Sequence, residues 1–160
     1  MRIISGTYRG KKLVPPADER VRPTTDRTKE AIFNIINSYI HDSCVFVDAF
    51  SGSGAIGIEA LSRGVKKAYF IDNDPDSVKL IEKNLKGIRG SYEIIKKDFS
   101  SAFKYISSSG AQADIIYCDP PYRQDLGEKI LKAVKESDLL SQTGKLLIER
   151  AKTIQPPVNE

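Results

Sequence analysis

Asp119-Pro120-Pro121-Tyr122 is the group of residues best suited to chemistry on an amino group. It directly follows the apolar run 114–118, which has the composition of a buried strand. The Asp119 carboxylate and the Pro120 carbonyl can accept both N–H bonds of a planar exocyclic amine, which turns the nitrogen lone pair out of the ring. The two prolines fix the backbone, and Tyr122 can stack on an extruded base. The box therefore predicts group transfer to the amine of a nucleic-acid base, and a turn without chemistry is the alternative.

A glycine-rich loop follows another apolar strand and opens a helix. Glycine lets the backbone approach a ligand closely, and a helix N-terminus offers free N–H groups. Asp72 ends the next strand, where a carboxylate can accept hydrogen bonds from ribose hydroxyls. These features alone also fit a dinucleotide site. The predicted cofactor contacts here are Phe50, Ser51, Gly52, Gly54, Asp72 and Asn73.

Asp48 distinguishes between these cofactors because it ends the first strand just before the glycine loop. A carboxylate there would repel a pyrophosphate but attract S-adenosylmethionine, which carries an amino group and a sulfonium. After the third strand, Asp98 offers an acceptor for an adenine amine and Phe99 an apolar flank. The alternative for the two acids is structural: Asp48 caps the loop and Asp98 caps the next helix.

Basic residues are concentrated at the start of the chain. Residues 1–30 hold eight Lys and Arg against four Asp and Glu, whereas the rest of the chain balances at seventeen each. Such a segment is typical of proteins that bind a phosphate backbone, although a solvated basic edge would have the same composition. The predicted RNA contacts are Arg2, Arg9, Lys11, Lys12, Arg22 and Arg27.

Composition predicts one globular domain over residues 1–160, with 40% hydrophobic and 29% charged residues. Two cysteines in apolar stretches and one histidine predict reduced thiols and no metal site. The absence of a long apolar run and of a secretory pattern predicts no membrane segment and a cytoplasmic location.

The pattern of elements predicts a basic hairpin or extension over residues 1–24 and an α/β core over 25–160. The hairpin would pair residues near 3–5 and 11–14, and a helix would run over 26–39. Alternating strands and helices then predict a mostly parallel, doubly wound sheet that binds its ligand beyond the carboxyl ends of the strands. The expected strands are 45–48, 68–71, 92–95, 114–118 and 145–149. Four further helices are expected: one that ends near residue 63, one that begins at 74–75, one near 100–106 and one over about 125–136.

Four motifs taken together closely resemble those of the bacterial small-subunit ribosomal RNA guanine-N2 methyltransferases, the RsmD family. They are Arg22-Pro-Thr-Thr-Asp-Arg27, Val47-Asp-Ala-Phe-Ser-Gly-Ser-Gly54, Ile71-Asp-Asn-Asp74 and Asp119-Pro-Pro-Tyr122. The resemblance implies a class I, Rossmann-like S-adenosylmethionine-dependent methyltransferase fold. It also implies methylation of guanine N2 in small-subunit ribosomal RNA or the assembling subunit. Thr24 and Thr25 would lie near the methionine end of the cofactor, and the basic first thirty residues would hold RNA phosphates.

The chain departs from this family pattern after residue 149. The class I sheet ends in an antiparallel hairpin, and eleven residues are too few to form it. The expectation is therefore a truncated chain or a core without the hairpin, with the fifth strand as an exposed edge. A monomer is expected for an intact enzyme. Three other functions stay open: adenine-N6 methylation of RNA or DNA, NAD-dependent oxidoreduction, and RNA binding without catalysis.

Overall fold

The computed structural model describes residues 1–17, 24–121 and 126–149. The predicted contacts Arg22 and Tyr122 lie outside the described residues, as does the segment after residue 149.

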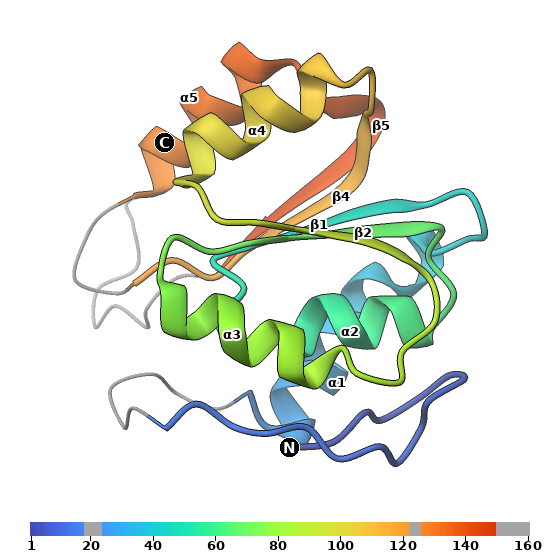
Figure 1. Cartoon of the computed structure of the whole chain (residues 1–160). Coiled ribbons are helices and arrows are strands. Elements are labelled where there is room, and N and C mark those ends of the chain that lie inside the picture. The colour runs from blue at the N-terminus through green and yellow to red at the C-terminus, as the bar shows by residue number, and fades with distance from the viewer. Residues whose placement is uncertain (18–23, 122–125, 150–160) are drawn as a thin grey trace, which may run out of the picture.

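Five parallel strands form one sheet in the order β3-β2-β1-β4-β5. From β1 the chain first adds β2 and β3 on one side and then crosses over to add β4 and β5 on the other, so the topological switch point lies between β1 and β4. Helices α1, α2 and α3 cover one face of the sheet, and α4 and α5 cover the other (Figure 1). This arrangement confirms the predicted doubly wound, Rossmann-like fold. The strands are β1 (Val45–Ala49), β2 (Lys67–Ile71), β3 (Ser91–Ile95), β4 (Ala113–Cys118) and β5 (Leu140–Ile148), and the helices are α1 (Asp26–Ile36), η1 (Asn37–Tyr39), α2 (Ala55–Ser62), α3 (Pro75–Asn84), α4 (Phe99–Ser108) and α5 (Gly127–Ser137).

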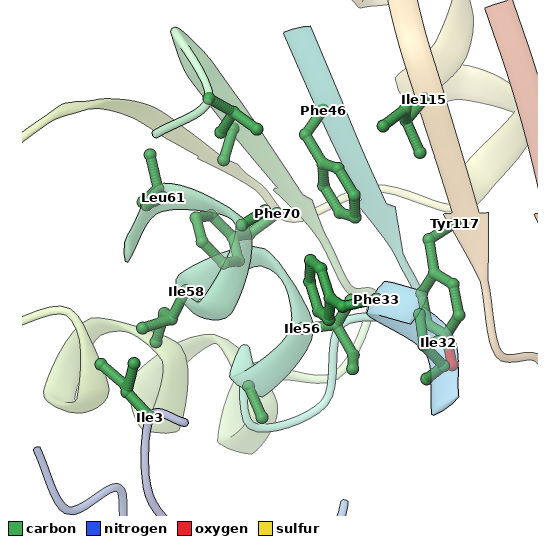
Figure 2. Close-up of a cluster of buried hydrophobic side chains, with 14 of the residues drawn as sticks. Ile3, Ile32, Phe33, Phe46, Ile56, Ile58, Leu61, Phe70, Ile115 and Tyr117 are labelled. Carbon is green, nitrogen blue, oxygen red and sulfur yellow. The ribbon is translucent and has the colours of Figure 1, made fainter. Parts of the chain in front are cut away.

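Each face of the sheet has its own hydrophobic core, because successive side chains of a strand point to opposite faces. Phe46, Phe70 and Ile115 point toward the helices α1 to α3, and Figure 2 shows them packed around Phe33 and Ile58. The side chains of alternate strand positions point the other way, into the core under α4 and α5. They are Val47, Tyr69, Ile71, Ile116 and Cys118.

Side-chain caps start three of the helices. The Thr25 hydroxyl accepts a hydrogen bond from the Thr28 N–H at the start of α1, and Asp98 accepts one from Ser101 at the start of α4. The predicted start of α3 is confirmed, since Asp74 is its cap and Pro75 its first residue. The predicted helix over 26–39 is present as α1 followed by the 3-10 turn η1.

Residues 1–13 form a narrow antiparallel loop, here called the N-terminal ribbon. The pairing of Arg2 with Lys12 is an isolated bridge, and the Ile3 and Lys11 backbones bond at 2.9 Å. The predicted hairpin is therefore present, although it is too irregular to count as two strands. Ile3 and Leu13 are buried in the core under α1 to α3, so the ribbon is packed against the body of the protein.

Strand β5 begins at Leu140, five residues earlier than the sequence indicated. Its pairing with β4 is irregular at that point, because Ala113 faces Leu140 whereas Ile115 already faces Lys145. The extra residues form a bulge, which interrupts the alternation of apolar residues that sequence reasoning relies on. In the described sheet β5 is an edge strand, as expected.

Candidate active site

The carboxyl ends of β1, β2 and β4 bring together the three acids Asp48, Asp72 and Asp119. In the register of the sheet Ala49 of β1 faces both Ile71 of β2 and Cys118 of β4, so the residues at these strand ends are neighbours. All three strands finish at the same edge of the sheet (Figure 1). The predicted catalytic box and the predicted cofactor loop therefore share one site.

Asp48 holds the glycine loop in shape from beneath. Its side chain is buried, and one carboxylate oxygen accepts hydrogen bonds from the Ser51 hydroxyl at 2.8 Å and the Gly57 N–H at 2.9 Å. The loop needs this support because Gly52 and Gly54 have φ values of 60° and 81°, in the left-handed region. Asp48 thus caps the glycine loop, which is the structural alternative considered for it, and a direct contact with a cofactor stays a prediction.

Asp72 ties the end of β2 to the same loop. One carboxylate oxygen accepts the Gly52 N–H at 2.8 Å and the other accepts the Asp74 N–H at 2.9 Å. A backbone bond from Ser51 to Ile71, also 2.9 Å long, adds a second tie. The loop and Asp72 therefore form one preorganised unit, with the neighbouring Asn73 exposed to solvent.

The environment of the three acids disfavours their negative charges. Burial raises the pKa of Asp48 to about 7, against the hydrogen bonds from Ser51 and Gly57, and the charges of Asp72 and Asp119 raise it further. The pKa of Asp119 is raised to about 6, first by partial removal from water and then by the Glu149 carboxylate. The pKa of Asp72 is raised as well, mainly by burial. A cationic ligand would relieve this repulsion and an anionic one would increase it.

Asp98 and Phe99 lie at the carboxyl end of β3. Asp98 is exposed, and its hydrogen bonds to Ser101 lower its pKa, so it caps α4 as the structural alternative proposed. Phe99 packs against Phe50 of the glycine loop, with ring centroids 5.4 Å apart. This contact was not anticipated from the sequence, and it gives the site an apolar wall between the loop and β3. A contact of Asp98 with an adenine amine stays a prediction.

The catalytic box begins directly at the end of β4. Pro120 is buried and Pro121 is exposed, whereas Asp119 keeps part of its surface in water although neighbouring residues crowd its carboxylate. Sequence reasoning missed Glu149 as a neighbour: its N–H bonds the Cys118 carbonyl at 2.8 Å, and its charge acts on Asp119. Cys118 is fully buried with a raised pKa, which fits packing and not a nucleophile.

Thr24 and Thr25 lie at the start of α1. Thr24 is half-buried, and the Thr25 hydroxyl both accepts the Thr28 N–H at 3.1 Å and donates to the Thr28 hydroxyl at 2.9 Å. These bonds explain the position of Thr25 through helix capping. The predicted place of both threonines near the methionine end of a cofactor stays a prediction.

The predicted RNA contacts are mostly exposed on and beside the N-terminal ribbon. Arg9, Lys12 and Arg27 are exposed, and Arg2 is exposed while pairing with Asp26 at 2.9 Å. The Lys11 ammonium group donates to the Lys86 carbonyl.

Lys29, which adds to the basic count of the first thirty residues, is fully buried and pairs with Glu59 of α2 at 3.3 Å. Glu59 also accepts the Ile4 N–H at 2.9 Å, the Ser5 N–H at 3.1 Å and the Arg63 Nε–H at 3.0 Å. This buried network fixes the ribbon to α2. The available signal was a single glutamate in the apolar helix 55–62.

Within the described ranges no group of three His, Cys, Asp or Glu side chains is placed to hold a metal ion. Across the same ranges no helix is long and apolar enough to cross a membrane.

Comparisons with known proteins agree with the geometry of this edge. A family described as Conserved hypothetical protein 95 matches residues 1–159. The Ribosomal RNA small subunit methyltransferase D of Haemophilus influenzae is 36% identical, over 95% of this chain and 79% of its own length. A solved hypothetical protein of Thermus thermophilus has a TM-score of 0.84 at 27% identity, covering 100% of this chain and 91% of that one. The solved Escherichia coli structure of yhhF, described as a methyltransferase, has a TM-score of 0.82 at 32% identity and covers 99% of this chain and 84% of that one. The chain therefore belongs to the family described as Conserved hypothetical protein 95, the RsmD family that its motifs resemble.

Proposed function

We propose that this chain is an S-adenosylmethionine-dependent methyltransferase that acts on the exocyclic N2 amino group of a guanine in small-subunit ribosomal RNA. The observation that carries the proposal is the meeting of the Asp119-Pro120 turn with the glycine loop at one edge of the sheet. Membership of the RsmD family and the names of its ribosomal RNA methyltransferases support the substrate class.

The residues at the end of β4 would prepare the amine. The Asp119 carboxylate and the Pro120 carbonyl accept its two N–H bonds, which draws the nitrogen lone pair out of conjugation with the base. Pro120 is buried and its backbone is restricted, so this carbonyl is held in place before the substrate arrives. Most of the rate then comes from alignment of the amine with the methyl group of the cofactor.

The acids at the sheet edge fit a cationic cofactor better than a dinucleotide. Asp48, Asp72 and Asp119 all have raised pKa values, so positive charge on a sulfonium and an ammonium would be stabilised here. A pyrophosphate would meet the same acids and be repelled, which disfavours the NAD-dependent alternative. Asp72 and the loop amides would hold the cofactor, and the bound cofactor would supply the methyl group.

Adenine-N6 methylation is the strongest competing function, since the Asp-Pro-Pro-Tyr box fixes the chemistry of an amine and not the identity of the base. The resemblance of the motifs to those of the small-subunit ribosomal RNA guanine-N2 methyltransferases favours guanine. RNA binding without catalysis is disfavoured because the Asp119 turn is formed and lies beside the loop.

The experiment that tests the proposal uses the purified chain and cofactor labelled on its methyl group. Unmodified small-subunit RNA, naked or in assembled subunits, is offered alongside large-subunit RNA as the matched control. Label in the small-subunit RNA alone is the expected result. Equal label in both RNAs would contradict the substrate, and cofactor binding without any transfer would contradict the enzymatic function.

A further inference from the structure

Helix α3 and the turn between α3 and β3 carry a second group of cations, and the turn lies against the N-terminal ribbon. Residues 79–89 contain Lys79, Lys83, Lys86 and Arg89 against the single acid Glu82, and all four cations are exposed. The overall balance of charge after residue 30 conceals this segment, because acids elsewhere compensate for it. Its position becomes visible only in the fold.

Direct bonds hold this turn to the ribbon. The Tyr8 hydroxyl accepts the Arg89 N–H at 2.7 Å and lies 3.3 Å from the Arg89 carbonyl, to which it donates. The Lys11 ammonium group donates to the carbonyl of Lys86. Figure 1 shows the ribbon running beneath α2 and α3, on the face away from α4 and α5. The ribbon that carries Arg9, Lys11 and Lys12 therefore lies on the same side of the molecule as the basic turn, and the Lys11 side chain reaches it directly.

A groove of about 420 Å³ continues this surface toward the candidate active site. Its walls are residues 14–17 and the side of α3 that carries Lys79, Leu80 and Lys83, and it reaches Gly52 of the cofactor loop. Two hydrogen bonds fix one wall to the other, since the Asn84 side chain accepts the Val14 N–H and donates to the Val14 carbonyl. The groove thus combines apolar walls with lysines.

The charges along the groove differ between its two ends and determine where the phosphates of a bound strand are favoured. Among the charged residues of the groove, Asp74 and Asp76 lie at the start of α3 and Lys79 and Lys83 lie further along the helix, and Lys86 and Arg89 follow in the turn after α3. A phosphate would be repelled at the first end and attracted at the second. An unpaired nucleotide strand has both features that such a surface accommodates, a charged backbone and flat apolar bases.

We propose that the ribbon, the end of α3 and the α3–β3 turn form one composite RNA-binding surface, in which Lys83, Lys86 and Arg89 contact phosphates of a single-stranded segment of the substrate RNA. This inference rests on the proposed function and adds to it residues outside the basic N-terminal segment. The ribbon is anchored by the buried Glu59 network, so the surface is preformed and does not depend on ordering a loose arm.

The test replaces the three cations in K83Q/K86Q/R89Q and measures the affinity for naked small-subunit RNA across a range of salt concentrations. K129Q/K132Q/K135Q is the matched control, since it removes the same charge from exposed positions of α5 on the opposite face. We expect the first variant to lose affinity by at least about tenfold and its salt slope to flatten by about one per lost phosphate contact. The control should keep both values, and both proteins should bind the cofactor as the wild type does.

An unchanged affinity and slope in K83Q/K86Q/R89Q would overturn the inference alone, provided that the wild type binds and methylates the RNA. An equal loss in both triple variants would also overturn it, because the effect would then follow net charge and not place. A wild type that binds no small-subunit RNA at any salt concentration would overturn the proposed function together with the inference.

Discussion

The carboxyl edge of the sheet and the N-terminal ribbon are built in opposite ways. The edge gathers acids whose charges repel one another, and each acid lies at the end of a strand or directly after it. The ribbon carries exposed cations and is held against α2 by the buried Glu59 carboxylate, which pairs with Lys29 of α1. On the proposed function, the first region would bind a small cationic ligand and the second would present a surface to a large polyanion.

The two regions differ in how they affect the stability of the folded protein. Uncompensated acids at the edge destabilise the free protein until a cation binds, so function is favoured there over stability. Where the ribbon packs against α2, Glu59 accepts hydrogen bonds from four donors, and its charge is balanced by Lys29 and Arg63. Mutations at the edge should therefore change activity, and mutations in the Glu59 network should change stability first.

The largest expected effect follows replacement of Asp119. Asp119→Ala should lower methyl transfer by about a thousandfold, because the amine loses the acceptor that redirects its lone pair. Cofactor affinity, measured by calorimetry, should fall by less than about tenfold, because Asp119 supplies only part of the negative charge that attracts the cofactor. Asp42→Ala, at an exposed turn before β1, is the control and should turn over normally. Normal turnover in Asp119→Ala would remove this residue from the mechanism.

Glu59→Ala should instead destabilise the fold. It leaves Lys29 buried without its partner and removes the acceptor of the Ile4 and Ser5 amides, at a cost of about 3–5 kcal/mol. Denaturant unfolding measures this free energy, and hydrogen exchange at the two amides locates it. Glu82→Ala, an exposed position on α3, should change stability by less than about 0.5 kcal/mol. Equal stability of the two variants would show that the network does not hold the ribbon.

Cofactor affinity should depend on pH through the acids of the edge. The pKa values of Asp48 and Asp119 are raised to about 7 and about 6, so both carboxyls lose protons as the pH rises from about 5.5 to about 8. The deprotonated forms attract a cation, and affinity should therefore rise by about tenfold over this range. Asp48→Asn should flatten the dependence. An affinity that stays constant or falls with rising pH would contradict the electrostatic account.

The smallest effect is expected from Tyr8→Phe, which changes no charge. Loss of the hydroxyl releases the Arg89 backbone from the ribbon and should weaken RNA binding by about fivefold, the equivalent of one hydrogen bond. Tyr105→Phe, on α4 at the opposite face, serves as its control. An RNA affinity that is the same in the two variants would mean that the bond does not align the surface.

The sequence predicts the carboxyl edge well because its parts are local. Strand, glycine loop and following acid lie within a few residues of each other, so apolar runs and turn residues indicate both fold and site. The strand ends place Asp48, Asp72 and Asp119 together as expected. The bulge that extends β5 to Leu140 was missed because it breaks the alternation on which such reasoning depends.

Contacts between distant segments could not be predicted in this way. Long stretches of chain separate Lys29 from Glu59, which form an ion pair, and Tyr8 from Arg89, which are joined by a hydrogen bond. No local sequence pattern indicates either contact. Lys29 was counted with the exposed basic segment although it is fully buried. A charged residue within an apolar helix, such as Glu59, is the one signal that could have indicated a buried pair.

The most direct test of the central claim is the identity of the methylated nucleoside. Small-subunit RNA labelled by the wild-type chain is digested, and the labelled nucleoside is identified by chromatography and mass. The account predicts label in N2-methylguanosine. Label in N6-methyladenosine would keep the role of the Asp119 turn but contradict the assigned base.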